Sequence, residues 1–481
     1  MEKPDWLFDR DKPWRQLTNF VDPARRGADL AIVYGRRRQG KTTLLEALAE
    51  STGGFYWQAR QQSSIQNLRS FSNEFTQWAG LTIPANFGHW DDALAAVFAL
   101  DQTKPVVIMI DEFGYLLDTA PEITSIIQAK LTPTASRTGN TRLIVCGSAF
   151  SQMRMLSAPD APLRGRAGLE LVVGPFDYRM AAQFWGLESN PLAAFELHSL
   201  LGGTPGYRQL ARTAPKAGDI DTWAIEHLLE PSSPLHREGR IVVDEDLGPK
   251  KRGLYWAVLA AISNGANRSA TLAEAIGQKE TALSHPLAML TDAGWIERRG
   301  DPLHKARSSF TITEPIIRAY QVLVEPNQTR ISRGMGEAVW HDATQPVASL
   351  IRGPHLETLA IEWLWTHAST TTRGGQPTTI NPAIFREGGR TYQLDVIATQ
   401  PRVDNTNEVI LVGETKARNT PMGATELHRL DNIIDRLGPR AATNPKRLLV
   451  SRSGFTSELK RLARGRPNIE LADLNRLYTN N

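Results

Sequence analysis

The feature that most constrains this chain is the eight-residue stretch Gly35-Arg-Arg-Arg-Gln-Gly40-Lys41-Thr42, which has the spacing G-x-x-x-x-G-K-[ST]. The apolar run 30–34 precedes it and the helical pattern 43–49 follows it. A strand, a glycine loop and a helix in this order bring backbone N–H groups to a helix N-terminus, where they can bind phosphate. A glycine turn before a surface helix could match the spacing by chance, but it would not require this order. The sequence therefore predicts a phosphate-binding loop in an α/β domain.

The residues of this loop have different expected tasks. Lys41 is expected to reach the β- and γ-phosphates of a nucleotide, and the Thr42 hydroxyl to hold Mg²⁺. The other predicted nucleotide contacts belong to the loop and the first turn of the helix: Gly35, Arg38, Gln39, Gly40 and Thr43.

A second apolar run, 105–110, ends in the acidic pair Asp111-Glu112. An unbroken apolar run of this length is typical of a strand buried in a parallel sheet, and ligands of such sheets bind at the carboxyl ends of the strands. Asp111 would hold Mg²⁺ through water, and Glu112 would polarise the attacking water. Ser148 follows a third run, 142–147, and could sense the γ-phosphate. An acidic pair alone also occurs where ordinary loops start, but beside the phosphate loop it indicates ATP hydrolysis.

Composition sets the broad class of the protein. A length of 481 residues predicts two to four domains, and 41% hydrophobic with 22% charged residues is typical of a soluble globular chain. The first ten residues lack an apolar signal core, and no apolar run is long enough to span a bilayer. The single cysteine, Cys146, lies in a predicted buried strand and excludes an internal disulfide. These features predict a cytoplasmic protein without a membrane partner.

Four parts follow one another along the chain. Residues 1–175 alternate strands with helices, and residues 176–250 are mainly helical. Residues 251–330 predict helices at 254–262, 270–276 and 280–292 and a hairpin of strands 294–300 and 308–312, the layout of a winged helix. Residues 331–481 form the last part.

The predicted hairpin suggests DNA as a partner, because its basic residues suit phosphate contacts: Arg298, Arg299, Lys305 and Arg307. The third helix offers only a weak set for reading bases: Glu280, Thr281, Ser284 and His285. A winged helix that binds a protein, or that has a purely structural role, remains the alternative.

The last part contains a second group of reactive side chains. Asp395 lies in the predicted strand 392–398, and the strand 408–413 runs into Glu414-Thr-Lys416. Residues 414 and 416 share one face of a strand, so Asp395 on the neighbouring strand can join them. Two carboxylates can bind Mg²⁺ or Mn²⁺, and the lysine can orient or deprotonate water. Glu357, in the helical stretch 355–365, could add a third acid.

Further strands at 447–455 and 468–473, with a helix between them, would complete a mixed sheet in this part. A solvated edge strand would show the same short acid-x-lysine pattern. Basic residues crowd the end of the chain, which indicates a DNA-binding surface or a solvated helix face: Lys446, Arg447, Arg452, Lys460, Arg461, Arg464 and Arg466.

These motifs resemble the archaeal-type ATPases of the STAND class, which are P-loop switch proteins related to AAA+ machines. The resemblance rests on residues 35–42, 110–116, 147–148, 162–166 and 202–207. It implies that Pro205 contacts adenine and that Arg166 senses or stabilises the γ-phosphate. Related machines often assemble through an arginine supplied in trans, for which Arg164 and Arg166 are candidates in a homo-oligomer. Both could equally be ordinary surface residues. The last part resembles the DUF234 domain, a PD-(D/E)xK nuclease-like fold.

Together the motifs predict an ATPase coupled to a metal-dependent DNA nuclease. The rival hypothesis is a nucleotide-gated DNA-binding or regulatory switch, in which the nuclease-like domain does not cut. Defence or mobile-element control would suit either activity.

Overall fold

The computed structural model describes residues 1–25, 27–100, 105–132, 139–148, 150–246, 252–402 and 406–479. The chain divides into two compact units. The first comprises Met1–Phe176 with Thr204–Gly206, and the second Asp177–Gly203 with Tyr207–Asn481. The predicted boundary at residue 175 lies next to Phe176. Apart from Phe176 and Thr204–Gly206, the three later predicted parts fall within the second unit, and their boundaries stay a prediction.

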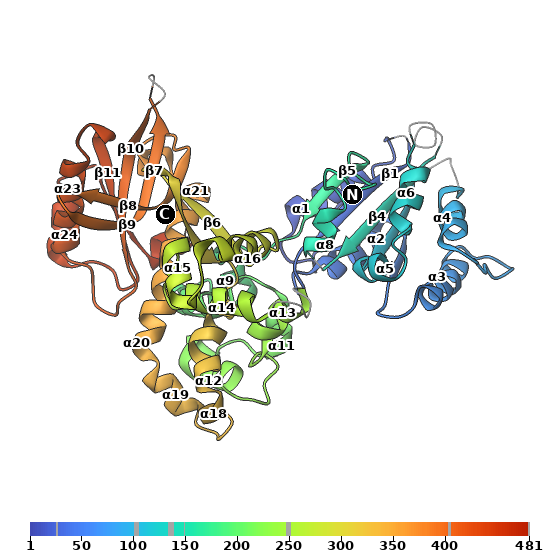
Figure 1. Ribbon diagram of the computed structural model, residues 1–481, viewed down its shortest axis with the longest axis horizontal. Helices are drawn as coiled ribbons and strands as arrows, with labels where there is room; N and C mark the ends of the chain where they lie inside the picture. Colours follow the sequence, from blue (N-terminus) through green and yellow to red (C-terminus); the bar gives the residue numbers. More distant parts are fainter. Residues whose placement is uncertain are drawn as a thin grey trace. The chain divides into compact units, whose positions relative to one another are not determined.

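The first unit contains a five-stranded parallel sheet in the order β2-β3-β4-β1-β5 (Figure 1). Its strands are β1 (Asp29–Tyr34), β2 (Phe55–Gln58), β3 (Val106–Asp111), β4 (Thr141–Gly147) and β5 (Ala167–Val172). Successive residues of the central strands enter apolar clusters on opposite faces, as Ile108 and Met109 do. Burial on both faces explains why these strands appear in the sequence as unbroken apolar runs.

Helices cover both faces of this sheet. α1 (Asp11–Phe20) and α2 (Lys41–Thr52) pack on one face. The other face is covered by α3 (Ser64–Trp78), α4 (Trp90–Phe98), α5 (Gly114–Thr119), α6 (Ile123–Lys130) and α8 (Phe150–Met155). A capping box between Ser63 and Gln66 starts α3, whose Phe71 and Phe75 enter the apolar core.

The parallel register brings the predicted motifs to one edge of the sheet. Tyr34 is paired with Gly147, and Gln58 with Asp111, so the carboxyl ends of these strands align. The phosphate loop follows β1, the acidic pair ends β3 and Ser148 follows β4. The predicted α/β core is confirmed in these elements.

Helices dominate the first part of the second unit. They are α9 (Tyr178–Trp185), α10 (Pro191–Leu201), α11 (Gly206–Ala211), η1 (Lys216–Gly218), α12 (Ile220–Leu228) and α13 (Glu238–Asp246). A later helical stretch contains α17 (Pro315–Ala319), η2 (Tyr320–Val324), η3 (Glu325–Asn327), α18 (Gln328–Ile331), α19 (Gly336–Asp342), α20 (Thr344–Pro346) and η4 (Val347–Arg352). Both stretches share one apolar core, to which Trp223, Leu323 and Val339 belong.

Every element predicted for the winged helix is present between these stretches. They are α14 (Arg252–Ser263), α15 (Ser269–Ile276), α16 (Glu280–Asp292) and a hairpin of β6 (Ile296–Asp301) and β7 (His304–Ile312). Leu283, Leu287 and Leu290 bury one face of α16 as their spacing predicts.

The chain ends in a mixed sheet of five strands in the order β12-β11-β10-β9-β8. Its strands are β8 (Thr379–Glu387), β9 (Arg390–Pro401), β10 (Asn407–Lys416), β11 (Ala441–Ser451) and β12 (Ile469–Asp473). Strands β8 to β10 are antiparallel and β10 to β12 parallel. α21 (Gly353–Thr366) and α25 (Leu474–Tyr478) pack on one face, and α23 (Ala424–Leu437) and α24 (Ser457–Arg464) on the other. The short α22 (Thr370–Arg373) and η5 (Gly438–Arg440) complete this part. The mixed sheet is confirmed, with β8 as an additional strand.

The β6–β7 hairpin lies against the outer side of β8. The Ile384 N–H donates to the Asp301 carboxylate at 3.2 Å, and the Asn381 side chain donates to the Gly300 carbonyl at 3.0 Å. Leu303, in the hairpin turn, packs with the apolar cluster that contains Phe385. The hairpin is therefore held by the mixed sheet.

Among the described residues, no helix has both the length and the apolar character that crossing a bilayer requires.

Candidate active site

Two glycines shape the loop that follows β1. A Cβ atom on Gly35 would lie 2.1 Å from the Val173 carbonyl oxygen, so the end of β5 leaves no room for a side chain there. Gly40 has φ +81°, a left-handed conformation that glycine adopts at little cost. Gly40 then caps α2, whose first residues are Lys41 and Thr42.

Arg10 supports this loop through a contact with its backbone. The sequence analysis did not single out this residue. Its guanidinium donates to the Gln39 carbonyl at 2.8 Å and lies 4.3 Å from the centre of the Phe176 ring. Burial lowers the pKa of Arg10 to about 10, although the charge of Asp9 opposes this shift. A single arginine near the N-terminus gives no signal in the sequence, because its partner is 29 residues away.

The segment around Pro205 also contacts the loop. The Gly206 N–H donates to the Arg38 carbonyl at 3.0 Å. The Pro205 ring lies 3.9 Å from the position that a Cβ atom would take at Gly40. This places Pro205 beside the phosphate loop, and its contact with adenine stays a prediction.

Asp111 is the centre of a hydrogen-bond network at the carboxyl edge of the sheet. It is fully buried, and its Oδ2 accepts from Thr42 Oγ1 at 2.7 Å and from the Tyr56 hydroxyl at 3.0 Å. Its Oδ1 accepts from the Glu112 N–H at 2.9 Å. Burial and the charge of Asp111 raise the pKa of Tyr56, so this hydroxyl acts as a donor. Tyr56 was another residue that the sequence analysis did not single out.

Glu112 and Ser148 form a second contact at this edge. The Ser148 hydroxyl donates to Glu112 Oε2 at 2.8 Å. Glu112 and Arg38 have φ values of 50° and 68°, which are unfavourable for residues with a side chain. Backbone strain of this kind concentrates at functional sites, where the surrounding structure holds it in place.

The remaining loop residues have the chemistry to bind a nucleotide phosphate. Lys41 is buried and its ammonium donates to the Arg36 carbonyl at 3.0 Å, whereas Thr43 is exposed on the first turn of α2. Thr42 and Asp111 provide hard oxygen ligands, the kind that Mg²⁺ prefers. The donor set thus fits Mg²⁺ with a phosphate group at the N-terminus of α2.

Arg166 does not join these residues. It directly precedes β5, where Ala167 is paired with Leu30 at the beginning of β1. In a parallel sheet this is the edge opposite the phosphate loop, and the Arg166 guanidinium donates to the Leu131 carbonyl at 3.3 Å. The expectation that Arg166 reaches the γ-phosphate within its own chain does not agree with this register. An arginine supplied by a second copy stays a prediction.

The predicted acids of the mixed sheet lie on neighbouring strands, Asp395 in the middle of β9 and Glu414 near the end of β10. Asp395 Oδ2 accepts from the Thr415 N–H at 2.8 Å. Glu414 is almost completely buried and ion-pairs with Lys416 and with Arg429 of α23. Its second oxygen, Oε2, is buried without a hydrogen bond among the described residues.

A β-bulge alters the direction of the strand at Asp395. Ala383 is paired with Leu394 but Asn381 with Ile397, so Asp395 and Val396 together oppose the single residue Pro382. Bulges of this kind re-aim side chains and are frequent next to active sites. Strict alternation of side chains along β9 therefore does not hold at this position.

Glu357 belongs to the same electrostatic group. Burial raises the pKa of Glu357, and the charge of Asp395 raises it further, while Arg318, Arg299 and Lys416 lower it. Burial and Asp395 also raise the pKa of Glu414. In the described part of the chain, however, no three His, Cys, Asp or Glu side chains are arranged as a metal-binding group.

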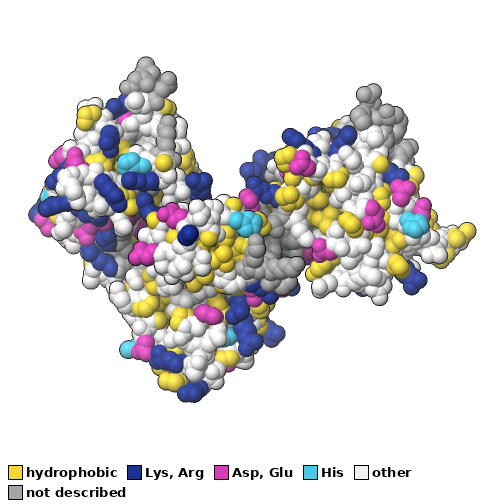
Figure 2. All heavy atoms as spheres, in the orientation of Figure 1, with side chains coloured by type: hydrophobic (Ala, Val, Ile, Leu, Met, Phe, Trp, Pro, Cys, Tyr) yellow, Lys and Arg dark blue, Asp and Glu magenta, His cyan; other side chains and the backbone are white. Residues whose placement is uncertain are grey.

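Several of the basic residues predicted to bind DNA form ion pairs with acidic residues of the chain. Lys446 pairs with Glu470, Arg447 and Arg466 with Asp431, and Arg452 with Glu196. Lys460, Arg461 and Arg464 are exposed on α24, and Figure 2 shows basic side chains gathered over this part of the surface.

In the hairpin, Arg299 is only 10% exposed and pairs with Glu297. Arg298 is exposed and donates to Ser308, while the side chain of Lys305 lies outside the described residues. Arg299 is therefore largely withdrawn from the surface, and contact of the hairpin with DNA stays a prediction.

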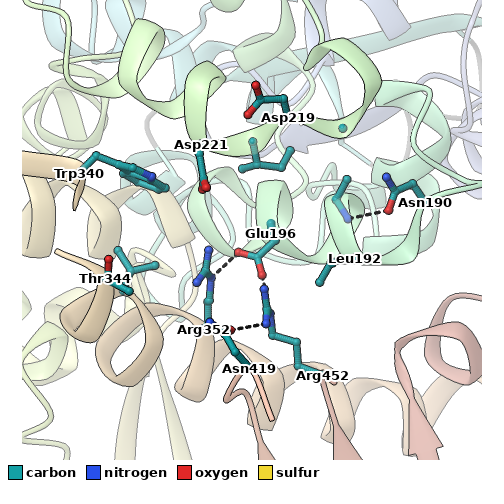
Figure 3. A pocket seen from close by; sticks show the side chains of 14 residues that line it. Asn190, Leu192, Glu196, Asp219, Asp221, Trp340, Thr344, Arg352, Asn419 and Arg452 are labelled. Atoms are coloured by element: carbon teal, nitrogen blue, oxygen red, sulfur yellow. Dashed lines mark hydrogen bonds and ion pairs between the residues drawn. The ribbon is translucent and has the colours of Figure 1, made fainter. Parts of the chain in front are cut away.

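A cavity of about 350 Å³ lies elsewhere in the second unit, lined by both polar and apolar side chains. Figure 3 shows Glu196 of α10 in its wall, between Arg352 and Arg452. Glu196 ion-pairs with both guanidinium groups, and Arg452 also donates to Asn419 at 2.6 Å. One buried carboxylate therefore joins α10 to the start of α21 and to the loop after β11.

Comparisons with known proteins agree with the geometry of the first unit. Residues 7–207 match the model of a family described as an ATPase domain predominantly from Archaea. The uncharacterized protein MJECL04 of Methanocaldococcus jannaschii is 24% identical over 338 residues, which are 68% of this chain and 71% of that protein.

Among solved structures, the Walker-type ATPase PABY2304 of Pyrococcus abyssi has a TM-score of 0.50 at 18% identity, covering 66% of this chain and 97% of that one. The ORC2 protein of Aeropyrum pernix, in ADPNP–ADP complexes, has a TM-score of 0.41 at 15% identity, covering 71% and 96%. Residues 7–207 thus resemble an ATPase domain of the archaeal type, and the chain shares a fold with a Walker-type ATPase.

Proposed function

We propose that the first unit binds ATP with Mg²⁺ and hydrolyses it. The observation that carries this proposal is the 2.7 Å hydrogen bond between Thr42 and Asp111, with Glu112 and Ser148 beside it. These side chains come from three segments that only the parallel sheet brings together, and each has the chemistry that one part of phosphoryl transfer requires.

The chain's own residues divide the work of hydrolysis. The loop N–H groups and the N-terminus of α2 bind the phosphates, and Lys41 exchanges the Arg36 carbonyl for phosphate oxygen. Glu112 orients the attacking water and accepts a hydrogen bond from it, while Ser148 holds the Glu112 carboxylate in place. Bound Mg²⁺ would neutralise the charge that develops on the phosphate oxygens.

Replacing Ser148 by Ala tests the contact with Glu112. We expect ATP binding to be unchanged and hydrolysis to fall about 10- to 150-fold, because loss of one hydrogen bond to a charged group costs roughly 1.5–3 kcal/mol. Phosphate release is measured with Mg²⁺ and with EDTA. Ser51→Ala is the control, since the Ser51 hydroxyl donates only to Ala47 of its own helix at 2.8 Å. Hydrolysis that persists in EDTA would contradict the proposal.

We further propose that the ATPase serves a transaction on DNA, in which the mixed sheet acts as a metal-dependent nuclease. The buried, unbonded Oε2 of Glu414 supports this assignment, because an orphaned carboxylate oxygen is a ready ligand for a cation. Asp395 would be the second ligand, and Lys416 would orient water. Glu357 would bind water near Asp395.

Asp395→Asn tests this nuclease assignment. The amide keeps the shape of the side chain but removes its charge. Loss of a residue that only orients a metal ligand lowers activity roughly 10- to 100-fold, so we expect the loss of a ligand itself to lower metal-dependent cleavage at least as much. Labelled single- and double-stranded DNA is incubated with Mg²⁺ or Mn²⁺, with and without ATP. Asp435→Asn, at an exposed position of α23, is the control. Equal cleavage by both variants would show that the site is elsewhere.

A second candidate function is a nucleotide-gated switch whose nuclease-like domain binds DNA without cutting it. The observation in its favour is Arg429, which together with Lys416 already compensates the charge of Glu414. DNA binding that responds to ATP, without cleavage in either metal, would establish this function instead.

A further inference from the structure

Tyr56 contacts the proposed metal site from a strand that no sequence motif marks. It lies on β2, beside β3, where it is paired with Met109. Its hydroxyl and that of Thr42 converge on the same oxygen of Asp111, at 3.0 Å and 2.7 Å. The other carboxylate oxygen accepts the Glu112 N–H. Both oxygens of a fully buried side chain are thus held from three different segments.

The hydroxyl of Tyr56 has no role in packing. Phe55 and Trp57, its neighbours in β2, enter the apolar core on one face of the sheet. Tyr56 points to the opposite face and packs against the cluster that contains Met109 and Cys146. A phenylalanine would fill this position equally well, so the hydrogen bond to Asp111 is what distinguishes tyrosine there.

We propose that Tyr56 is a positioning residue that sets how strongly this site takes up Mg²⁺ with nucleotide. The inference rests on the proposed ATP–Mg²⁺ function. Mg²⁺ requires near-ideal octahedral geometry, so its affinity depends on how rigidly its ligands are held. Thr42 alone cannot fix Oδ2, because its own oxygen must also face the metal. Tyr56 supplies a second donor on a ring that packing keeps in place.

This role predicts an effect on metal-dependent binding and not on nucleotide binding as such. The loop N–H groups and Lys41 bind phosphate without help from Asp111. Removing the Tyr56 hydroxyl therefore leaves affinity in EDTA unchanged and reduces the gain in affinity that Mg²⁺ brings. The selectivity for Mg²⁺ over Ca²⁺ decreases as well, because Ca²⁺ tolerates irregular geometry.

The test measures binding of a fluorescent ATP analogue to the full chain, in EDTA, Mg²⁺ and Ca²⁺, for wild type and Tyr56→Phe. We expect the Mg²⁺-dependent gain to shrink about tenfold in Tyr56→Phe, the order expected for one hydrogen bond to a charged acceptor. The matched control is Tyr320→Phe, which removes a hydroxyl that donates to the Glu325 carboxylate at 2.6 Å in the second unit. Melting temperatures of both variants verify that the fold is kept.

The outcomes separate this inference from the function on which it rests. A wild type without Mg²⁺-dependent nucleotide binding overturns both. An unchanged Mg²⁺ gain in Tyr56→Phe overturns the role of Tyr56 and leaves the ATPase proposal standing. Equal loss of affinity in EDTA and in Mg²⁺ assigns Tyr56 a purely structural role and also overturns the inference. A selective loss of the Mg²⁺ gain, absent from Tyr320→Phe, supports it.

Discussion

Replacing Glu112 by Gln is expected to leave ATP binding intact and to lower hydrolysis by about 10²- to 10⁴-fold, the usual contribution of a positioned general base. The amide keeps the size of the side chain and can still accept the Ser148 hydroxyl, whose bond to Glu112 is 2.8 Å. It has no negative charge with which to polarise water. Phosphate release in single-turnover conditions and binding of a fluorescent nucleotide measure the two properties separately.

Glu122→Gln is the matched control for this experiment. Glu122 is exposed and directly precedes α6 in the same unit, so its replacement tests the loss of a carboxylate away from the site. We expect wild-type hydrolysis from it. If Glu112→Gln hydrolysed ATP as fast as this control, another residue would have to orient the water, and the role assigned to Glu112 would be wrong.

Replacing Glu196 by Ala is expected to destabilise the second unit by about 3–5 kcal/mol, the usual cost of removing one member of a buried ion pair. The Arg352 and Arg452 side chains are each only 12% exposed and would both lose their carboxylate partner. The positive charges of the two guanidinium groups would then no longer be balanced by this carboxylate. Unfolding in urea, followed by circular dichroism, gives the change in free energy.

Two variants bracket this effect. Glu188→Ala, at an exposed position just before α10, should change stability by less than about 0.5 kcal/mol. The free energy of unfolding of Glu196→Gln should lie between those of Glu188→Ala and Glu196→Ala. The amide oxygen still accepts hydrogen bonds but no longer balances the charges. A stability of Glu196→Ala equal to that of Glu188→Ala would mean that solvent replaces the carboxylate at no cost.

Local sequence patterns were enough to predict most helices and strands of this chain. They predicted the contacts between these elements less well. The strand, glycine loop and helix around Lys41 appear as an uninterrupted pattern, and so do the three helices and the hairpin of residues 252–312. Strand β8 was missed because Pro382 interrupts its apolar pattern, which is acceptable only because β8 is an edge strand.

The missed site residues share a physical cause. Tyr56 and Asp111 are 55 residues apart, and only the register between β2 and β3 brings them together. In the same way, the register between β1 and β5 places Arg166 at the edge of the sheet opposite the phosphate loop. Sequence spacing predicts which residues share a face of one element, but not which strands become neighbours. The bulge at Asp395 adds a local irregularity that a period of two cannot predict.

The contact between the β6–β7 hairpin and β8 affects how this protein can be divided for experiments. A fragment beginning at residue 331 would contain the whole mixed sheet but would lack Asp301, the acceptor for the Ile384 N–H. The outer side of β8 would then be open to pairing with another chain, the usual cause of aggregation at sheet edges. A fragment that starts with the second unit, at Asp177, keeps this edge covered. It also retains Glu196 and the helices that share the apolar core, so it is the sounder choice for expressing the C-terminal region.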